Sequence, residues 1–66
     1  MNVWLNGERA ETRGAQNIAE LTERYGLHPN TILIEHNGVA LHRREWRESR
    51  VDEDDRIEFI RVVAGG

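Results

Sequence analysis

The chain contains no cysteine, no lysine and only one proline, and it has no long apolar run. The absence of cysteine excludes a disulfide framework, a thiol nucleophile, and thiolate sites for zinc or iron–sulfur clusters. Because all nine basic residues are arginine, no side chain of this protein can accept an isopeptide bond. No segment approaches the roughly 20 apolar residues that span a bilayer, and residues 1–4 lack the features of a signal peptide. We therefore expect a cytoplasmic protein that does not contact a membrane.

The length and the charge of the chain limit its possible functions. Sixty-six residues form one domain with a thin core, because a chain near this size buries only about 60% of the surface that its unfolded form exposes. Little space remains for an enclosed active site. The formal net charge of −3 argues against nucleic acid as a partner, because phosphate binding needs a clustered positive field.

The first residues predict a β-hairpin. A short strand at residues 3–5 leads into Asn6-Gly7, and both of these residues tolerate the positive φ of a type I′ turn. The returning strand is expected from Glu8 to about residue 12. Trp4 points away from the face that its two neighbours share, so it either contacts a partner or packs on a neighbouring strand.

A single main helix is predicted after this hairpin. Asn17 is a good N-cap, and Glu20 is placed to reach back to the backbone N–H of the cap. Gly26 is suited to the left-handed residue that ends a helix. One apolar stripe follows the helical spacing and should pack on a sheet: Ile18, Leu21 and Tyr25.

Residues 31–41 predict a second hairpin around Asn37-Gly38. In its first strand, Ile32, Ile34 and His36 share one face. His36 stands where an apolar residue is expected. We favour a hydrogen-bonded histidine at the margin of the sheet over a titrating or ligand histidine.

Residues 42–50 change in character and predict one or two helical turns. Trp46 is expected to anchor this segment to the core, because a large aromatic side chain buries much apolar surface. The arginines of this segment form either a basic patch for an acidic partner or a solvated face neutralised by Glu45 and Glu48. We favour the solvated face.

The last strand is expected at residues 56–63, after a solvated acidic turn at 52–55. Ile57 and Phe59 should face the core, whereas Ile60 and Val62 are candidates for an exposed apolar strip of the kind that marks interaction surfaces. These elements together predict an α+β domain over residues 1–63, with one helix across a mixed sheet of four to five strands.

Ala64-Gly65-Gly66 follows the last strand as a predicted flexible tail, residues 64–66. Glycine permits a close approach of another backbone. Three extended residues project about 10 Å. Such a tail can present the Gly66 carboxylate inside the active site of another protein while the folded domain stays outside.

Five segments carry a resemblance to a known family: residues 3–7, 17–25, 34–38, 43–46 and 55–66. Together they resemble the ubiquitin-like β-grasp sulfur carriers, the group that includes ThiS and MoaD. The spacing of Arg43 and Trp46 and the absence of a proline before the tail are more similar to ThiS. Two features depart from the pattern: Asp54-Asp55 stands where Gly-Asp is usual, and His36 replaces a β-branched residue.

The resemblance implies a carrier and not an enzyme. An E1-like, ThiF-like activating enzyme would adenylate the Gly66 carboxylate, and a sulfur donor would convert it to a thiocarboxylate for a ThiG-like thiazole synthase of thiamine biosynthesis. ATP and magnesium would belong to the activating enzyme, and the carrier would hold no stable cofactor and no metal. Ala64, Gly65 and Gly66 would enter the active-site channel. The residues expected to contact the partner are Ile60, Val62, Trp4 and Arg61.

Three alternatives stay open. The same tail chemistry could serve molybdopterin or another sulfur-transfer pathway, or the chain could be a ubiquitin-like binding module that is never activated. A metal-dependent hydrolase that uses His28, His36 and His42 is disfavoured, because their spacings match no metal motif.

Overall fold

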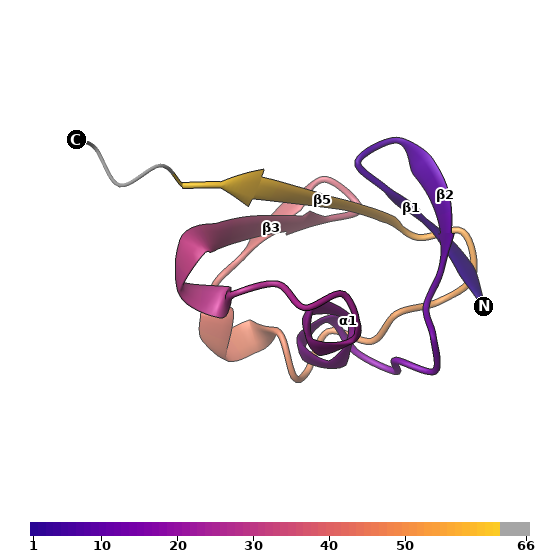
Figure 1. Cartoon of the computed structure of the whole chain (residues 1–66), viewed down its shortest axis with the longest axis horizontal. Coiled ribbons are helices and arrows are strands. Elements are labelled where there is room, and N and C mark those ends of the chain that lie inside the picture. Colours follow the sequence, from indigo (N-terminus) through magenta and orange to yellow (C-terminus); the bar gives the residue numbers. More distant parts are fainter. Residues whose placement is uncertain (63–66) are drawn as a thin grey trace.

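The computed structural model describes residues 1–62 and contains one five-stranded sheet in the order β2-β1-β5-β3-β4. Helix α1 lies across one face of this sheet, and two short 3₁₀ helices, η1 and η2, connect the elements (Figure 1). The elements in chain order are β1 (Asn2–Leu5), β2 (Glu8–Glu11), α1 (Ile18–Arg24), η1 (Pro29–Thr31), β3 (Ile32–His36), β4 (Val39–Leu41), η2 (Arg43–Glu45) and β5 (Arg56–Arg61). The predicted α+β class, the mixed sheet and the helical turn before Trp46 are confirmed.

The central strand β5 joins the two halves of the sheet. It pairs in parallel with β1 and antiparallel with β3, whereas β1–β2 and β3–β4 are antiparallel hairpins. The last strand thus lies beside the first, a pairing that the sequence alone did not determine. β5 runs along the sheet toward the end of the molecule that is remote from the N-terminus (Figure 1).

Both predicted Asn-Gly turns are present. The φ angles are +49° and +82° at Asn6 and Gly7, and +52° and +84° at Asn37 and Gly38. Two successive positive φ values define the type I′ turn, whose twist matches that of the flanking strands. The two turns therefore set the registers of both hairpins.

The helix begins at the predicted cap, but one predicted bond is different. The Glu20 amide donates to Asn17 Oδ1 at 2.8 Å, as expected. The Glu20 carboxylate, however, accepts from the Gln16 amide at 2.8 Å and not from the Asn17 amide. Backbone bonds from the Ile18 amide to Ser49 and from the Val51 amide to Gln16 hold this start of the helix against residues 49–51. At the other end, Gly26 has φ +64°, in agreement with its predicted role.

The core lies between α1 and the sheet. Trp46 is only 4% exposed and anchors the segment after η2, which confirms its predicted role. Nine buried apolar side chains form this core: Val3, Ala15, Ile18, Leu21, Ile32, Ile34, Trp46, Val51 and Ile57. No helix in the described part of the chain, residues 1–62, is long and apolar enough to cross a membrane.

The acidic turn before β5 is not fully solvated, which corrects the prediction. The Asp55 side chain is 13% exposed, and its carboxylate accepts from His36 Nε2 at 2.7 Å and from the Asp52 amide at 2.9 Å. Asn37 Nδ2 is a third donor at 3.2 Å. Burial alone would raise the pKa of Asp55, but these hydrogen bonds outweigh it and hold the pKa below its ordinary value. His36 is the hydrogen-bonded histidine that we favoured.

Candidate functional site

The two faces of the sheet differ in what covers them. Helix α1 covers one face, and within residues 1–62 no helix lies over the other (Figure 1). Successive residues of a strand point to opposite faces. In β5, Ile57 is fully buried under α1, whereas Glu58 and Ile60 are exposed on the open face. The open face is therefore the part of the sheet available to another molecule.

Three apolar side chains lie exposed at the end of the open face that is nearest the tail. Ile60 and Val62 are 46% and 49% exposed, as predicted, and Leu33, 56% exposed, is the direct cross-strand partner of Ile60. We call Leu33, Ile60 and Val62 the apolar strip. Leu33 was not among the predicted residues, although its place between the inward-facing Ile32 and Ile34 implies an outward side chain.

The last described residue, Val62, is held to the sheet. Its amide donates to the Thr31 carbonyl at 2.8 Å, so the pairing of β5 with the start of β3 extends to this residue. The remaining four residues, 63–66, lie outside the described part of the chain. They include the predicted tail residues Ala64, Gly65 and Gly66 and the predicted boundary between the domain and the tail.

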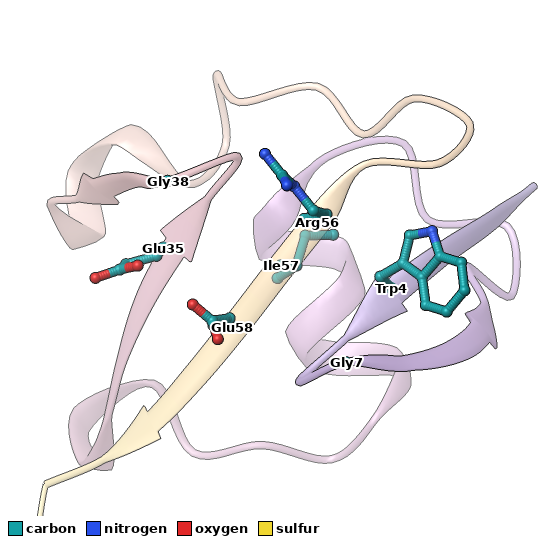
Figure 2. A pocket seen from close by; sticks show the side chains of 7 residues that line it. All are labelled: Trp4, Gly7, Glu35, Gly38, Arg56, Ile57 and Glu58. Carbon is teal, nitrogen blue, oxygen red and sulfur yellow. The ribbon is translucent and has the colours of Figure 1, made fainter.

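A hollow of about 500 Å³ lies on the open face at the other end of β5 (Figure 2). Trp4 borders it and is 38% exposed. The Arg9 guanidinium lies 5.1 Å from the centre of the Trp4 ring, and Arg9 is its cross-strand neighbour. Trp4 therefore packs on a neighbouring strand and is also accessible, and its contact with a partner stays a prediction. The lining residues are Trp4, Gly7, Glu35, Gly38, Arg56, Ile57 and Glu58.

Two glutamates lie between the hollow and the apolar strip. Glu35 of β3 and Glu58 of β5 are direct cross-strand partners, and Figure 2 shows both side chains on the open face. Like charges placed directly opposite each other destabilise a sheet. Within residues 1–62, neither carboxylate forms an ion pair with a basic side chain. The open face therefore carries two carboxylates without an ion-pair partner beside its apolar strip, with Arg56 at the far end of the same hollow.

Both Asn-Gly turns hold β5 through their side chains as well as their backbones. Asn6 Oδ1 accepts from the Phe59 amide and Asn37 Oδ1 accepts from the Arg56 amide, each at 2.8 Å. The backbone amides of Asn6 and Asn37 donate to the carbonyls of Ile57 and Arg56 at 3.0 and 2.7 Å. These bonds fix the strand that leads to the tail.

The predicted partner-binding residues do not all lie together. Ile60, Val62 and Trp4 lie on the open face, at its two ends. Arg61 is exposed but pairs with the buried Ile32, which places it on the opposite face of β5. The structure therefore separates Arg61 from the other three residues.

The arginines after β4 are solvated, but they are not neutralised as we expected. Within residues 1–62 no carboxylate lies within 4.0 Å of Arg43, Arg44 or Arg47. The Glu45 carboxylate accepts from the His42 amide at 2.7 Å, so it caps η2 instead of pairing with an arginine.

The structure offers no support for the metal-dependent alternative. Among residues 1–62, no three histidine, aspartate or glutamate side chains are grouped so that they could hold a metal ion. His36 is bound to Asp55.

The architecture is that of a β-grasp domain: a mixed five-stranded sheet with one helix across it and a central last strand that ends in an apolar strip. The particular family follows from the sequence match. The chain belongs to the ThiS family, whose model matches residues 3–66.

Solved structures support this assignment. The crystal structure of the thiamine biosynthesis protein ThiS from Geobacter metallireducens is 29% identical to this chain, covers 100% of both chains and superposes with a TM-score of 0.85. The solution structure of a thiamine biosynthesis protein from the same organism has a TM-score of 0.80 and 29% identity. It covers 100% of this chain and 88% of the other.

Two further relatives resemble this chain in sequence. An uncharacterised protein, ycf40, of Trieres chinensis is 22% identical over 63 residues, which cover 96% of this chain and 86% of the relative. A thiazole synthase of Magnetococcus marinus is 27% identical over 66 residues. That match covers 100% of this chain but only 20% of the synthase.

Proposed function

We propose that this protein is a sulfur carrier whose Gly66 carboxylate is adenylated and converted to a thiocarboxylate that donates sulfur to the thiazole of thiamine. The observation that carries the proposal is the extent of the family match, which runs to residue 66 and so includes the Gly65-Gly66 tail. The name of the Geobacter metallireducens structure, a thiamine biosynthesis protein, supports the choice of pathway.

The chemistry requires activation by another protein. A carboxylate is a poor electrophile, because its charge repels nucleophiles and oxide is a poor leaving group. Attack of the Gly66 carboxylate on the α-phosphorus of ATP forms an acyl adenylate and releases pyrophosphate. A sulfur nucleophile then adds to the carbonyl carbon and AMP leaves, so that one carboxyl oxygen is exchanged for sulfur. ATP and magnesium are held by the activating enzyme in this proposal, and the carrier is a co-substrate.

The residues of the chain itself would position the tail. The apolar strip of Leu33, Ile60 and Val62 would bury its exposed surface against the activating enzyme. The bond from Val62 to Thr31 fixes the point from which residues 63–66 extend. Four residues span at most about 14 Å, which is the greatest depth at which the reacting carbonyl can lie beyond the docked domain.

The proposed partners are an E1-like, ThiF-like activating enzyme, a sulfur donor and a ThiG-like thiazole synthase. Support for the synthase comes from the Magnetococcus marinus relative, a thiazole synthase that contains a region similar to this whole chain. A synthase that carries such a region would have its carrier attached to it.

The pathway can be tested by following the consumption of the thiocarboxylate. The protein is first loaded with ³⁵S and then mixed with thiazole synthase or with the large subunit of molybdopterin synthase, each with its own acceptor substrate. We expect transfer of the label only with thiazole synthase. Transfer only to the molybdopterin precursor would reassign the pathway and retain the carrier chemistry.

A further inference from the structure

A second hollow lies on the helix-covered side of the molecule. It measures about 180 Å³ and lies between α1, η1 and the segment that begins with η2. Figure 1 shows that segment, in orange, beside α1 and away from the open face of the sheet. We call it the arginine hollow. Its lining residues are Ala19, Thr22, Glu23, Pro29, Arg43, Arg44, Trp46 and Arg47.

Three arginines line this hollow without a carboxylate partner among residues 1–62. Their guanidinium groups repel one another, and the only acidic side chain of the lining, Glu23, forms no ion pair with them. The hollow therefore has an excess of positive charge in a chain whose formal net charge is −3. That local excess is complementary to an acidic ligand.

The type of charge that lines the hollow suits carboxylates. Guanidinium groups bind carboxylates with two parallel hydrogen bonds, which a lysine ammonium cannot do. Arg43 Nη1 donates to Asn30 Oδ1, and this bond holds one guanidinium at the rim. Arg43 and Arg44 belong to η2, and Arg47 lies in the turn that follows it, so one short segment supplies all three guanidinium groups.

A buried hydrogen-bond donor of Trp46 is a second, independent observation at this hollow. Its side chain lines the hollow and is 4% exposed, yet its indole Nε1–H is buried without an acceptor among residues 1–62. Buried donors without a partner are rare in native proteins. Among residues 1–62 this donor has no acceptor, and the hollow beside it is rich in donors, because its lining carries three arginines and one glutamate.

We propose that the arginine hollow binds an acidic segment of a partner protein through at least two of its carboxylates. A single free anion would be held weakly, because exposed ion pairs compete with water and salt. A segment with several carboxylates matches three arginines at once. The hollow and the apolar strip lie on opposite sides of the sheet, so a partner bound here leaves the open face accessible.

The proposal can be tested with the full chain and a capped hexaglutamate peptide. Trp4→Phe leaves Trp46 as the only tryptophan, and its fluorescence then reports on the hollow. We expect a saturable change with one peptide per chain, and an affinity that falls as the salt concentration rises. Arg47→Glu in the same background should weaken binding roughly tenfold, because it replaces a charged donor with a repelling group.

Arg50→Glu is the matched control, since Arg50 is exposed on the same segment, does not line the hollow and gives the same change in charge. Circular dichroism establishes that each variant is folded. Equal loss of binding in Arg50→Glu and Arg47→Glu would overturn the proposal, as would the absence of a saturable signal. If free phosphate or acetate saturated the signal at the same total concentration of negative charge as the peptide, the hollow would be assigned to small anions instead. Concentration-dependent dimerisation that Arg47→Glu abolishes would assign it to a second copy of the chain.

Discussion

Strand β5 carries isoleucine side chains on both faces, and their surroundings differ. Ile57 is fully buried beneath α1, whereas Ile60, three residues further along the strand, is 46% exposed on the open face. Ile57 contributes to stability by leaving water on folding. Ile60 contributes less, because nearly half of it stays exposed, and beside it the like charges of Glu35 and Glu58 repel each other. The comparison shows that folding and docking depend on alternate residues of one strand, so mutations can separate them.

The largest expected effect on stability is at the inward face. Ile57→Ala should lower the free energy of unfolding by about 2–5 kcal/mol, because it leaves a cavity in a core of only nine residues. Ile57→Val, with an expected loss of about 0.5–1.5 kcal/mol, keeps the effect measurable if the alanine variant does not fold. Urea denaturation gives both values. If Ile57→Ala lost less free energy of unfolding than Ile60→Ala, the proposed difference between the two faces of β5 would be contradicted.

A second prediction concerns the start of β5, where Asp55 binds His36, Asn37 and the Asp52 amide. Since folding lowers the pKa of Asp55, its contribution is present above the unfolded pKa of about 3.8 and is lost as the pH falls through the lower folded pKa. Asp55→Asn should therefore destabilise the protein by about 1–3 kcal/mol at pH 7 and less below pH 4.

Thermal unfolding between pH 2 and pH 7 measures this difference. Asp52→Asn is the control, because its side chain is exposed. If the stability of Asp55→Asn fell with pH as steeply as that of the wild type, Asp55 would not contribute to the loss of stability in acid.

A third, smaller effect is expected at the turns that hold β5. Asn37→Gly and Asn6→Gly retain the positive φ but remove the side-chain bonds to the Arg56 and Phe59 amides. Each should lower stability by about 1 kcal/mol. Asn37→Gly should lower it by more, because Asn37 Nδ2 donates to the charged Asp55 carboxylate at 3.2 Å, whereas Asn6 Nδ2 donates to the neutral Phe59 carbonyl at 3.4 Å. Chemical denaturation of the two variants compares them directly. Equal stability of both variants and the wild type would mean that the backbone bonds alone fix β5.

The smallest effect on stability, and the largest on docking, is expected at the apolar strip. Leu33→Ser and Ile60→Ser should each change the free energy of unfolding by less than about 0.5 kcal/mol. If the strip docks the activating enzyme, each variant should weaken that binding about tenfold, since a buried aliphatic side chain contributes about 1.5–3 kcal/mol.

Val39→Ser is the matched control for calorimetric binding to the activating enzyme. Val39 is 60% exposed, but it pairs with His36 on the other face of the sheet. Equal weakening by Val39→Ser would show that the strip is not the docking surface.

Local sequence signals predicted most of the elements, because each signal acts over a few residues. Asn-Gly requires positive φ at adjacent positions, and Asn17 satisfies an amide three residues away. Contacts between distant parts of the chain were not predictable in the same way. The hydrogen bond from the Phe59 amide to Asn6 and the bond between His36 and Asp55 form only after the sheet has brought these residues together.

The candidate site was predicted in part, for a similar reason. Alternation along β5 indicated that Ile60 and Val62 are exposed. The same alternation along residues 32–36 implied that Leu33 points outward, but only the pairing with Ile60 showed that Leu33 joins the apolar strip. The proximity of Glu35 and Glu58 and the lack of ion pairs around Arg43 and Arg47 also depend on tertiary contacts.

The intact mass of the protein tests the central claim most directly. The chain is incubated with ATP, magnesium, a ThiF-like activating enzyme and a sulfide source, and a chain without Gly66 is treated in the same way. We predict that the full chain gains the mass of one oxygen-to-sulfur exchange only when ATP is present, and that the shortened chain gains nothing. A folded full chain that forms neither adenylate nor thiocarboxylate with an active enzyme would contradict the account and favour a ubiquitin-like binding module.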